Sequence, residues 1–408
     1  MARGVRAKPR TSALESPRWA DDRAGLLAKQ APHVTTIRRL WTFTLDHSLL
    51  LFVGAATGLV WANVDLDSYD RLVHVMHFVV NDIGMAFFFA LAAKEVVEST
   101  APSGALHSPR RAGMPLLAAI GGMTGPALIF VGLAIATARR DLLPGWAIPC
   151  ATDIAFSYLV ARLIFGAKHP AIPFLLLLAI ADDALGLAIL AMFYPTGTLR
   201  LMEFVALLGA AVGLAFWLRS RVRQSLWPYI LAPGVVSWLA FFRGGLHPAL
   251  ALVPIIPFLR HARRDPGLFV EGHGRDPLTG FEHCWKEPVQ VVLLFFGLVN
   301  AGVPASHTGA GTWIVLASIL LGKPLGILVF TALGAALGLH RPTGVSWRDL
   351  IVVGLAAAIG FTVALFFATA AFPVGPLLDE AKMGALLSFA AAGLAFGAAH
   401  VLRVVRVR

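Results

Sequence analysis

Two adjacent aspartates, Asp182 and Asp183, lie in the middle of the apolar stretch AIADDALGLAIL at residues 179–190. An ionisable side chain at the centre of a membrane helix costs roughly 2.5–3.5 kcal/mol on insertion scales, so such residues face a cavity or a partner. Consecutive helical residues are rotated by about 100° around the helix axis. The two carboxylates therefore point in different directions, and one can face a cavity while the other pairs with a cation.

Two more charged residues lie deep in apolar segments. Lys323 is the one amine far enough from a predicted helix end to pair with the aspartates, and Asp153 is a third carboxylate at similar depth. Three carboxylates do not cancel against one amine, so permanent pairing alone does not explain them. Hard cations prefer oxygen ligands, and Na⁺ would compete with H⁺ for the same carboxylate oxygens. If access alternates between the two membrane faces, this competition gives cation/proton exchange.

Two segments near these charges predict irregular backbone. In GWAIPCATDIAF, Pro149 removes a main-chain donor just before Thr152 and Asp153. In AAAIGFTVALFF, Gly360 and Thr362 interrupt an otherwise smooth apolar helix. Paired interruptions in the two halves of a transporter indicate discontinuous helices that cross near the membrane midplane. Such helices place partial charges inside the membrane, which one carboxylate and one amine would offset.

The composition predicts the class of fold that must position these residues. The chain of 408 residues is 57% hydrophobic and 14% charged, with a mean hydropathy of +0.74. A soluble domain would carry roughly a quarter charged residues, and apolar runs of ~20 residues, long enough to span a bilayer, recur here. We therefore predict an all-α polytopic membrane protein embedded in the lipid bilayer. The net charge of +11 is spread over loops, which argues against a nucleic-acid partner.

Hydropathy predicts about twelve transmembrane helices, at residues 48–63, 74–98, 113–137, 146–165, 171–194, 201–218, 228–241, 246–259, 289–304, 312–338, 347–372 and 381–402. The N-terminal tail and every second loop after it hold most of the 34 lysines and arginines. Because cytoplasmic loops are enriched in these residues, we expect both termini in the cytoplasm. Residues 1–45 are expected to be a disordered basic cytoplasmic tail without a signal peptide. Residues 46–408 would form a single membrane domain with a cytoplasmic loop near 260–287.

The two cysteines predict neither a disulfide nor a metal cluster. Cys150 lies in an apolar segment and Cys284 in a polar loop, far away along the chain. Lys94 and Glu98 lie near the end of the second predicted span, where snorkelling of long side chains towards water explains them.

Six stretches together resemble the NhaA-type family of sodium/proton antiporters. They are GWAIPCATDIAF, LAIADDALGLAIL, GLHPALA, FGLVNAGV, LLGKPLGILVF and IGFTVALFF, and they follow in family order over about residues 48–402. The resemblance implies an inverted-repeat antiporter fold with two discontinuous crossed helices. It also implies an electrogenic Na⁺(Li⁺)/H⁺ antiporter of the bacterial inner membrane that exports sodium, serves pH homeostasis and needs no cofactor besides its substrate ions.

The same resemblance implies roles for individual residues. Asp182 and Asp183 match the essential aspartate pair of the family. Asp183 would be the more direct ligand of Na⁺ or Li⁺, with Thr152 nearby, and Asp182 would carry protons and pair with Lys323 when no cation is bound. Asp153 and Lys323 match the charges that balance the crossed helix ends.

The chain departs from the family pattern in regions linked to pH activation and dimer formation. Glu95, Glu282 and His283 keep family positions and are candidate pH-sensing residues, but AAKEVVES and TGFEHCWKEP lack basic residues that the family has beside them. We therefore expect a shifted or weak pH response. The connection NVDLDSYDRLVH is too short for the β-hairpin that holds the family homodimer together, so a homodimer is left open.

Other functions fit these residues less well. If the aspartates were permanently paired with Lys323, their role would be structural, and they would only hold neighbouring helices together. An intramembrane aspartic protease needs a GxGD-type loop, and neither Asp153 nor Asp182 follows such a glycine pattern. A sodium-coupled symporter of an organic anion, on a similar crossed-helix fold, would want a roomier polar cavity and is the main alternative, beside a channel or a non-transporting sensor. The sequence thus favours a secondary active transporter over an enzyme.

Overall fold

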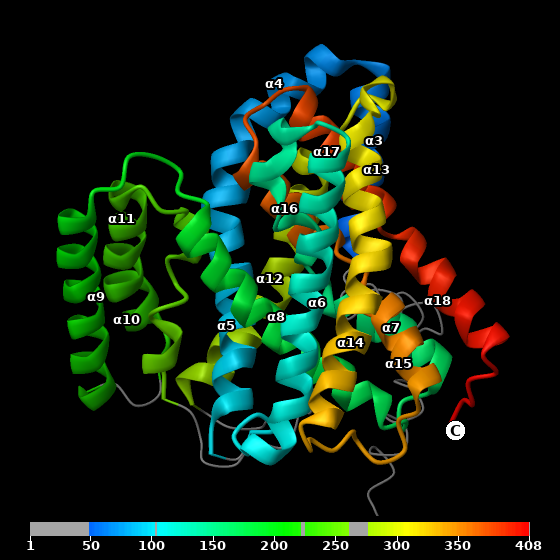
Figure 1. The fold of residues 1–408 in the computed structure, drawn as a ribbon. Coiled ribbons are helices and arrows are strands. Elements are labelled where there is room, and N and C mark those ends of the chain that lie inside the picture. The colour runs from blue at the N-terminus through cyan, green and yellow to red at the C-terminus, as the bar shows by residue number, and fades with distance from the viewer. Residues whose placement is uncertain (1–48, 103, 222–224, 261–275, 408) are drawn as a thin grey trace, which may run out of the picture. The chain divides into compact units, whose positions relative to one another are not determined.

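The computed structural model describes residues 49–102, 104–221, 225–260 and 276–407, and every regular element within these ranges is a helix (Figure 1). The predicted tail at 1–45 and the part of the predicted loop at 261–275 lie outside the described residues. Six described helices are long and apolar enough to cross a membrane, or eight if each of two bent pairs counts as one span. The predicted all-α polytopic membrane fold is thereby confirmed.

The helices of the first half are α3 (Leu49–Val64), α4 (Leu66–His77), η1 (Phe78–Gly84), α5 (Met85–Thr100), α6 (Pro109–Ala136), η2 (Arg140–Gly145), η3 (Ile148–Cys150), α7 (Ile154–Phe165), α8 (Ala171–Phe193) and α9 (Leu201–Arg221). Those of the second half are α10 (Trp227–Tyr229), η4 (Ile230–Gly234), α11 (Val235–Gly244), η5 (Pro248–Leu250), η6 (Ile256–Phe258), α12 (Pro277–Asn300), η7 (Ala305–His307), α13 (Ala310–Ala317), η8 (Ser318–Gly322), α14 (Lys323–Ala336), α15 (Trp347–Ala357), α16 (Phe361–Ala371), α17 (Pro376–Leu387) and α18 (Ala390–Val401).

One predicted span differs from a regular helix. Residues 246–259 form the short 3₁₀ helices η5 and η6, joined by turns. Pro248, Pro254 and Pro257 explain this, because each lacks the main-chain N–H that an α-helix would use. Helix α12 begins at Pro277, inside the predicted loop near 260–287.

A wider π-helical turn, η8, directly precedes Lys323. Pro324 follows and has no N–H to donate to the carbonyl four residues earlier, so the α-helical pattern fails at this point. The chain continues as α14 in nearly the same direction, and α13 to α14 form one span over Ala310–Ala336. The π turn thus sets the direction in which the Lys323 side chain leaves the span.

Two groups of three spans repeat the same order. In each group a continuous span comes first, a bent pair second and a further helical span last, over residues 109–193 and 310–401. The bent pairs are the segment Arg140–Cys150 with α7, at 55°, and α15 with α16, at 50°. Figure 1 shows α6 and α14 running side by side, with α9 and α11 packed together at the other side of the molecule. This repeat places the two interruptions next to each other.

Helices α6 and α14 approach closely enough for their backbones to touch. A Cβ atom built on Gly125 would lie 2.8 Å from Gly326 Cα, and one on Gly326 would lie 3.1 Å from Gly125 Cα. Small residues at such contacts are the usual means of close helix packing in membranes. The contact holds Lys323, the first residue of α14, against the centre of the protein.

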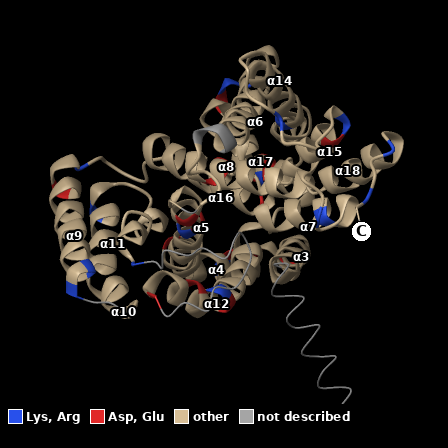
Figure 2. Ribbon diagram, turned by 90° about the horizontal axis from the view of Figure 1, so that it is seen from below, with Lys and Arg blue, Asp and Glu red and all other residues tan. Residues whose placement is uncertain are grey.

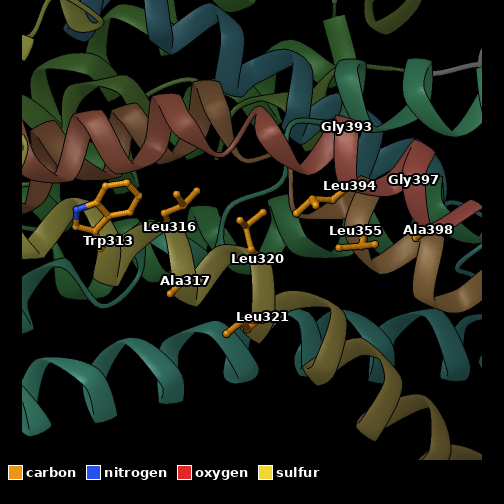
Figure 3. Close-up of a pocket in the computed structure, with 10 residues that line it drawn as sticks. All are labelled: Trp313, Leu316, Ala317, Leu320, Leu321, Leu355, Gly393, Leu394, Gly397 and Ala398. Atoms are coloured by element: carbon orange, nitrogen blue, oxygen red, sulfur yellow. The ribbon is translucent and has the colours of Figure 1, made fainter. Parts of the chain in front are cut away.

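The outer surface is largely apolar. Figure 2 shows few charged positions along the helices, with acidic and basic positions lying together at α5. A groove of about 740 Å³ runs between the span of α13 to α14 and α18, and its lining includes Trp313, Leu320 and Gly397 (Figure 3). Such an apolar groove suits contact with lipid tails.

Candidate functional site

The aspartate pair lies at the middle of α8, with about half of the helix on either side. Asp182 is only 3% exposed, whereas Asp183 is half-buried. Their different surroundings follow from the rotation of ~100° between neighbouring helical residues. Asp182 is thus held by partners, as described next, whereas both aspartates line the same cavity.

Two other predicted site residues, Thr152 and Lys323, bind the same oxygen of Asp182. Thr152 Oγ1 donates to Asp182 Oδ2 at 2.8 Å. Lys323 Nζ lies 3.2 Å from the same oxygen, and its side chain is fully buried. The two donors come from different elements, the break before α7 and the start of α14. Asp182 on α8 therefore joins the break before α7, in the same three-span group, to α14 in the other group.

Lys323 and Asp153 each form a hydrogen bond at the interruption before α7. Lys323 Nζ also donates to the main-chain oxygen of Cys150, the last residue of η3. Asp153 begins α7 as its N-cap, and Asp153 Oδ1 accepts from Phe156 N at 3.5 Å. An amine at the carboxyl end of a helical segment and a carboxylate at the amino end of another both match the sign of the helix dipole.

Asp153 reaches the second interruption as well. Its Oδ2 accepts from Thr362 Oγ1 and from Thr362 N, the latter at 3.4 Å. Its main-chain N–H donates to Ile359 O at 2.7 Å. Gly360 is required here, because a Cβ atom would lie 2.8 Å from Ala151 O. The two breaks are thus bonded to each other through the main chain, and one carboxylate serves the start of both α7 and α16.

A small cavity lies beside the aspartates. Its volume is about 20 Å³, and it is lined by Asp182, Asp183, Thr152, Cys150 and Met123 among others. This is room for about one water-sized sphere. Asp182 Oδ1 is buried and has no hydrogen-bond partner in the described part of the chain. A buried carboxylate oxygen without a partner is costly, and a proton or a small cation in the cavity would satisfy it.

Two of the predicted pH-sensing residues, Glu95 and Glu282, belong to a second charged cluster, centred on Lys94. Lys94 Nζ lies 2.6 Å from Glu282 Oε2, 2.7 Å from Glu98 Oε2 and 3.5 Å from Glu95 Oε1. The cluster joins α5 to α12. His283 is exposed on α12 and contacts none of these residues through an ion pair or hydrogen bond that the described chain provides. The structure therefore brings Glu95 and Glu282 together and leaves His283 apart.

Sequence reasoning was wrong about Lys94 and missed one partner of Asp153. Lys94 does not snorkel to water: it is 4% exposed because three glutamates surround its amine. The acidic residues at 95 and 98 carried a usable signal, two carboxylates close to one amine in the sequence. Thr362 had been noted only as part of an interruption, yet it binds Asp153. Nothing in the residue types identified the Cys150 carbonyl as a partner of Lys323, because every residue has one.

Comparisons with known proteins identify relatives over most of the chain. The Na(+)/H(+) antiporter NhaA of Jannaschia sp. (strain CCS1) is 47% identical, covering 87% of this chain and 96% of the relative. The Na(+)/H(+) antiporter NhaA of Geobacter metallireducens is 46% identical over 89% of this chain and 97% of the relative. That of Desulfitobacterium hafniense (strain DCB-2) is 44% identical over 92% and 99%.

A solved structure has the same fold at low sequence identity. The sodium proton antiporter MjNhaP1 of Methanocaldococcus jannaschii, solved at pH 8, superposes with a TM-score of 0.50 over 88% of this chain and 90% of that one, at 15% identity. The resemblance predicted from the six stretches is confirmed, since the family described as Na+/H+ antiporter 1 matches residues 42–399. The chain therefore belongs to the Na+/H+ antiporter 1 family.

Proposed function

We propose that this chain is an electrogenic Na⁺(Li⁺)/H⁺ antiporter in which one cation and protons compete for Asp182 and Asp183. One observation carries the proposal: Asp182 Oδ2 is held by Thr152 and Lys323, whereas Oδ1 is buried without a partner. Asp182 and Asp183 line one cavity. Two carboxylates beside one cavity outnumber the single Lys323 amine, so the site attracts a small cation or a proton.

The cycle follows from the partners of each group. Without a cation, Lys323 pairs with Asp182, as observed. When Na⁺ enters, the carboxylates of Asp182 and Asp183 and the hydroxyl of Thr152 supply its oxygen ligands. Within the described residues no three His, Cys, Asp or Glu side chains form a metal site, so a hydroxyl or main-chain oxygens must complete the shell. Asp183 releases one proton, and the Lys323–Asp182 pair, whose second proton is held on the Lys323 amine, releases the other. Two protons then leave for one Na⁺, which makes the exchange electrogenic.

The residues at the two interruptions affect the electric field at the exchange site. Asp153 lies at the start of α7 and of α16, and Lys323 at the end of η3. We assign both residues to balancing the partial charges of these helix ends. With those charges balanced, the site can change its own net charge without an opposing field from the helix ends.

The cluster around Lys94 is where we place the response to pH. Glu95, Glu98 and Glu282 share one amine, so their state of protonation decides how strongly α5 is tied to α12. His283 lies outside this cluster and would act only through a rearrangement. The amine at position 94 already neutralises part of the acidic charge, in keeping with the expected weak or shifted response.

We further propose that the protein lies in the bacterial inner membrane with both termini in the cytoplasm, exporting sodium. The excess of lysine and arginine on alternate loops supports this orientation. A single residue, Asp65, separates α3 from α4, and no strand pair fits in that connection. A homodimer would therefore need another contact surface.

The alternatives are less compatible with the site. A cavity of about 20 Å³ holds no organic anion, which argues against the symporter. An aspartic protease dyad needs two carboxylates facing each other across two helices, but Asp182 is bonded to Thr152 and Asp153 to Thr362.

The test uses purified protein in liposomes that are acidic inside and contain a pH-sensitive dye. Addition of Na⁺ or Li⁺ outside should raise the internal pH, while choline should not. Asp183→Asn should abolish the response, and Asp67→Asn, the same change at an exposed site in the first turn of α4, should preserve it. A gradient that persists with both cations at every pH between about 6 and 9 refutes the proposal.

A further inference from the structure

One wall of the cation cavity is built from sulfur-containing residues. Cys150 and Met123 line the cavity together with Asp182 and Asp183, and both are buried, at 1% and 6% exposure. Cys150 Sγ donates to Met123 O at 3.2 Å, which places the thiol between η3 and α6. Hard oxygen ligands and soft sulfur ligands therefore border the same small volume.

The cavity lining also includes a carboxylate, that of Asp182, which attracts a cation. Asp182 is 3% exposed, and its Oδ1 has no partner in the described chain. Asp182 lies in the same cavity lining as Cys150 and Thr152. A monovalent cation that reaches the unsatisfied carboxylate is therefore brought next to the thiol, whatever the softness of the cation.

We propose that a soft monovalent cation, for which Ag⁺ is the probe, enters this cavity in place of Na⁺ and is trapped there by Cys150. Thiolates and thioethers are the preferred ligands of soft monovalent metal ions such as Cu(I), and the Met123 thioether is the second soft ligand. This inference rests on the proposed function, since it uses the route by which Na⁺ reaches the aspartates.

The binding step balances without an oxidant. The S–H bond of Cys150 breaks, a bond between sulfur and Ag⁺ forms, and the displaced proton passes to the buffer. No electrons are transferred. Na⁺ forms no such bond with sulfur and leaves in each cycle, whereas Ag⁺ stays. The result is an inhibitor that competes with Na⁺ for access and then dissociates slowly.

The chain offers a matched control. Its second cysteine, Cys284, lies on α12 and does not line the cavity. The experiment uses Cys284→Ser as the background and compares it with the Cys284→Ser, Cys150→Ala double variant. Both are reconstituted in liposomes with nitrate or gluconate salts, because silver chloride is insoluble. Loss of Na⁺-driven pH change is followed over time after micromolar Ag⁺, and each rate is scaled to that variant's own uninhibited rate.

We expect progressive inactivation of the Cys284→Ser protein and none of the double variant. Na⁺ at ten times its apparent Km should slow the inactivation about tenfold, as simple competition requires. Met123→Leu in the same background should allow faster recovery once Ag⁺ is removed. Inactivation that Na⁺ does not slow, or that proceeds equally in the double variant, overturns the proposal.

A binding measurement tests the proposal without transport, in case the Cys150→Ala variant exchanges ions too slowly for its inactivation to be followed. Equilibrium dialysis of detergent-purified protein should show one Ag⁺ more per chain in Cys284→Ser than in the double variant. Equal Ag⁺ content in the two proteins overturns the proposal. The proposed antiport is judged separately, by exchange without Ag⁺, so the failure of one idea is distinguishable from the failure of the other.

Discussion

The glycine contact between α6 and α14 gives a prediction in which geometry alone decides the result. A Cβ atom at position 125 would lie 2.8 Å from Gly326 Cα and 3.1 Å from Gly326 N, and would overlap Gly322 O. All three atoms belong to the backbone, so no rotamer change relieves the clash. In Gly125→Ala, α14 must therefore move away from α6 and carry Lys323 with it.

The size of the effect follows from two distances. Overpacking that shifts the backbone costs about 1–3 kcal/mol of stability. Lys323 Nζ lies 3.2 Å from Asp182 Oδ2, so an outward shift on the order of 1 Å stretches the pair beyond ion-pair range. We therefore expect Gly125→Ala to lower the Tm and also to slow Na⁺/H⁺ exchange, because Asp182 loses one of its two partners.

Gly132→Ala, two turns further along α6, is the control. Nothing lies within 4 Å of a Cβ atom at position 132, and alanine favours a helix over glycine by up to about 1 kcal/mol. Thermal unfolding in detergent and exchange in liposomes are measured for both variants. We expect an unchanged or raised Tm and normal exchange for Gly132→Ala. If the two variants behave alike, the contact does not position Lys323, and the reasoning is refuted.

Three further predictions concern single groups. Thr152→Val keeps the side-chain shape but removes the hydroxyl on the shared carboxylate. We assign this hydroxyl to the oxygen shell of Na⁺, and a lost ligand worth about 1.4 kcal/mol weakens binding about tenfold. The Km for Na⁺ should therefore rise about tenfold, whereas Thr57→Val at an exposed site should not change it. Lys94→Met leaves three carboxylates without their shared cation and should lower the Tm, unlike Lys168→Met at an exposed position. The pKa of Asp65 lies below its ordinary 3.8, chiefly because a first-turn main-chain N–H of α4 donates to it. Its stabilisation is present above 3.8 and is lost as the pH falls through the lowered pKa, so Asp65→Ala should lower the Tm at neutral pH and progressively less in acid.

Each of these predictions has an outcome that contradicts it. An unchanged Km in Thr152→Val would mean that the hydroxyl only shapes the break. Equal Tm values for the two lysine variants would mean that the cluster contributes no net stability. A Tm loss in Asp65→Ala that is the same at every pH would assign the effect to packing and not to the carboxylate.

The site residues that could be predicted from the sequence are those whose residue type is costly in its surroundings. Asp182 and Asp183 stand out because carboxylates are expensive in a membrane helix. Pro149 and Gly360 stand out because both disturb a helix. These are local properties, readable in a window of a few residues.

The remaining features depend on distance in space, which a sequence window does not contain. The burial of Lys94 requires Glu282 from α12, and nothing near position 94 indicates that contact. The bond from Lys323 to the Cys150 carbonyl uses the main chain, so no residue type marks it. In the sequence, Thr362 is only part of an interrupted helix. In the structure, its hydroxyl donates a hydrogen bond to Asp153.

The bond from Asp153 N to Ile359 O limits how the ion preference of this scaffold can evolve. It joins two main-chain atoms, so among single replacements only proline at position 153, which lacks the N–H, deletes it. Neither interrupted segment can therefore change its shape without the other. Gradual retuning must then come from side chains that border the cavity. A larger change in cavity dimensions requires coordinated substitutions in two segments far apart in the gene.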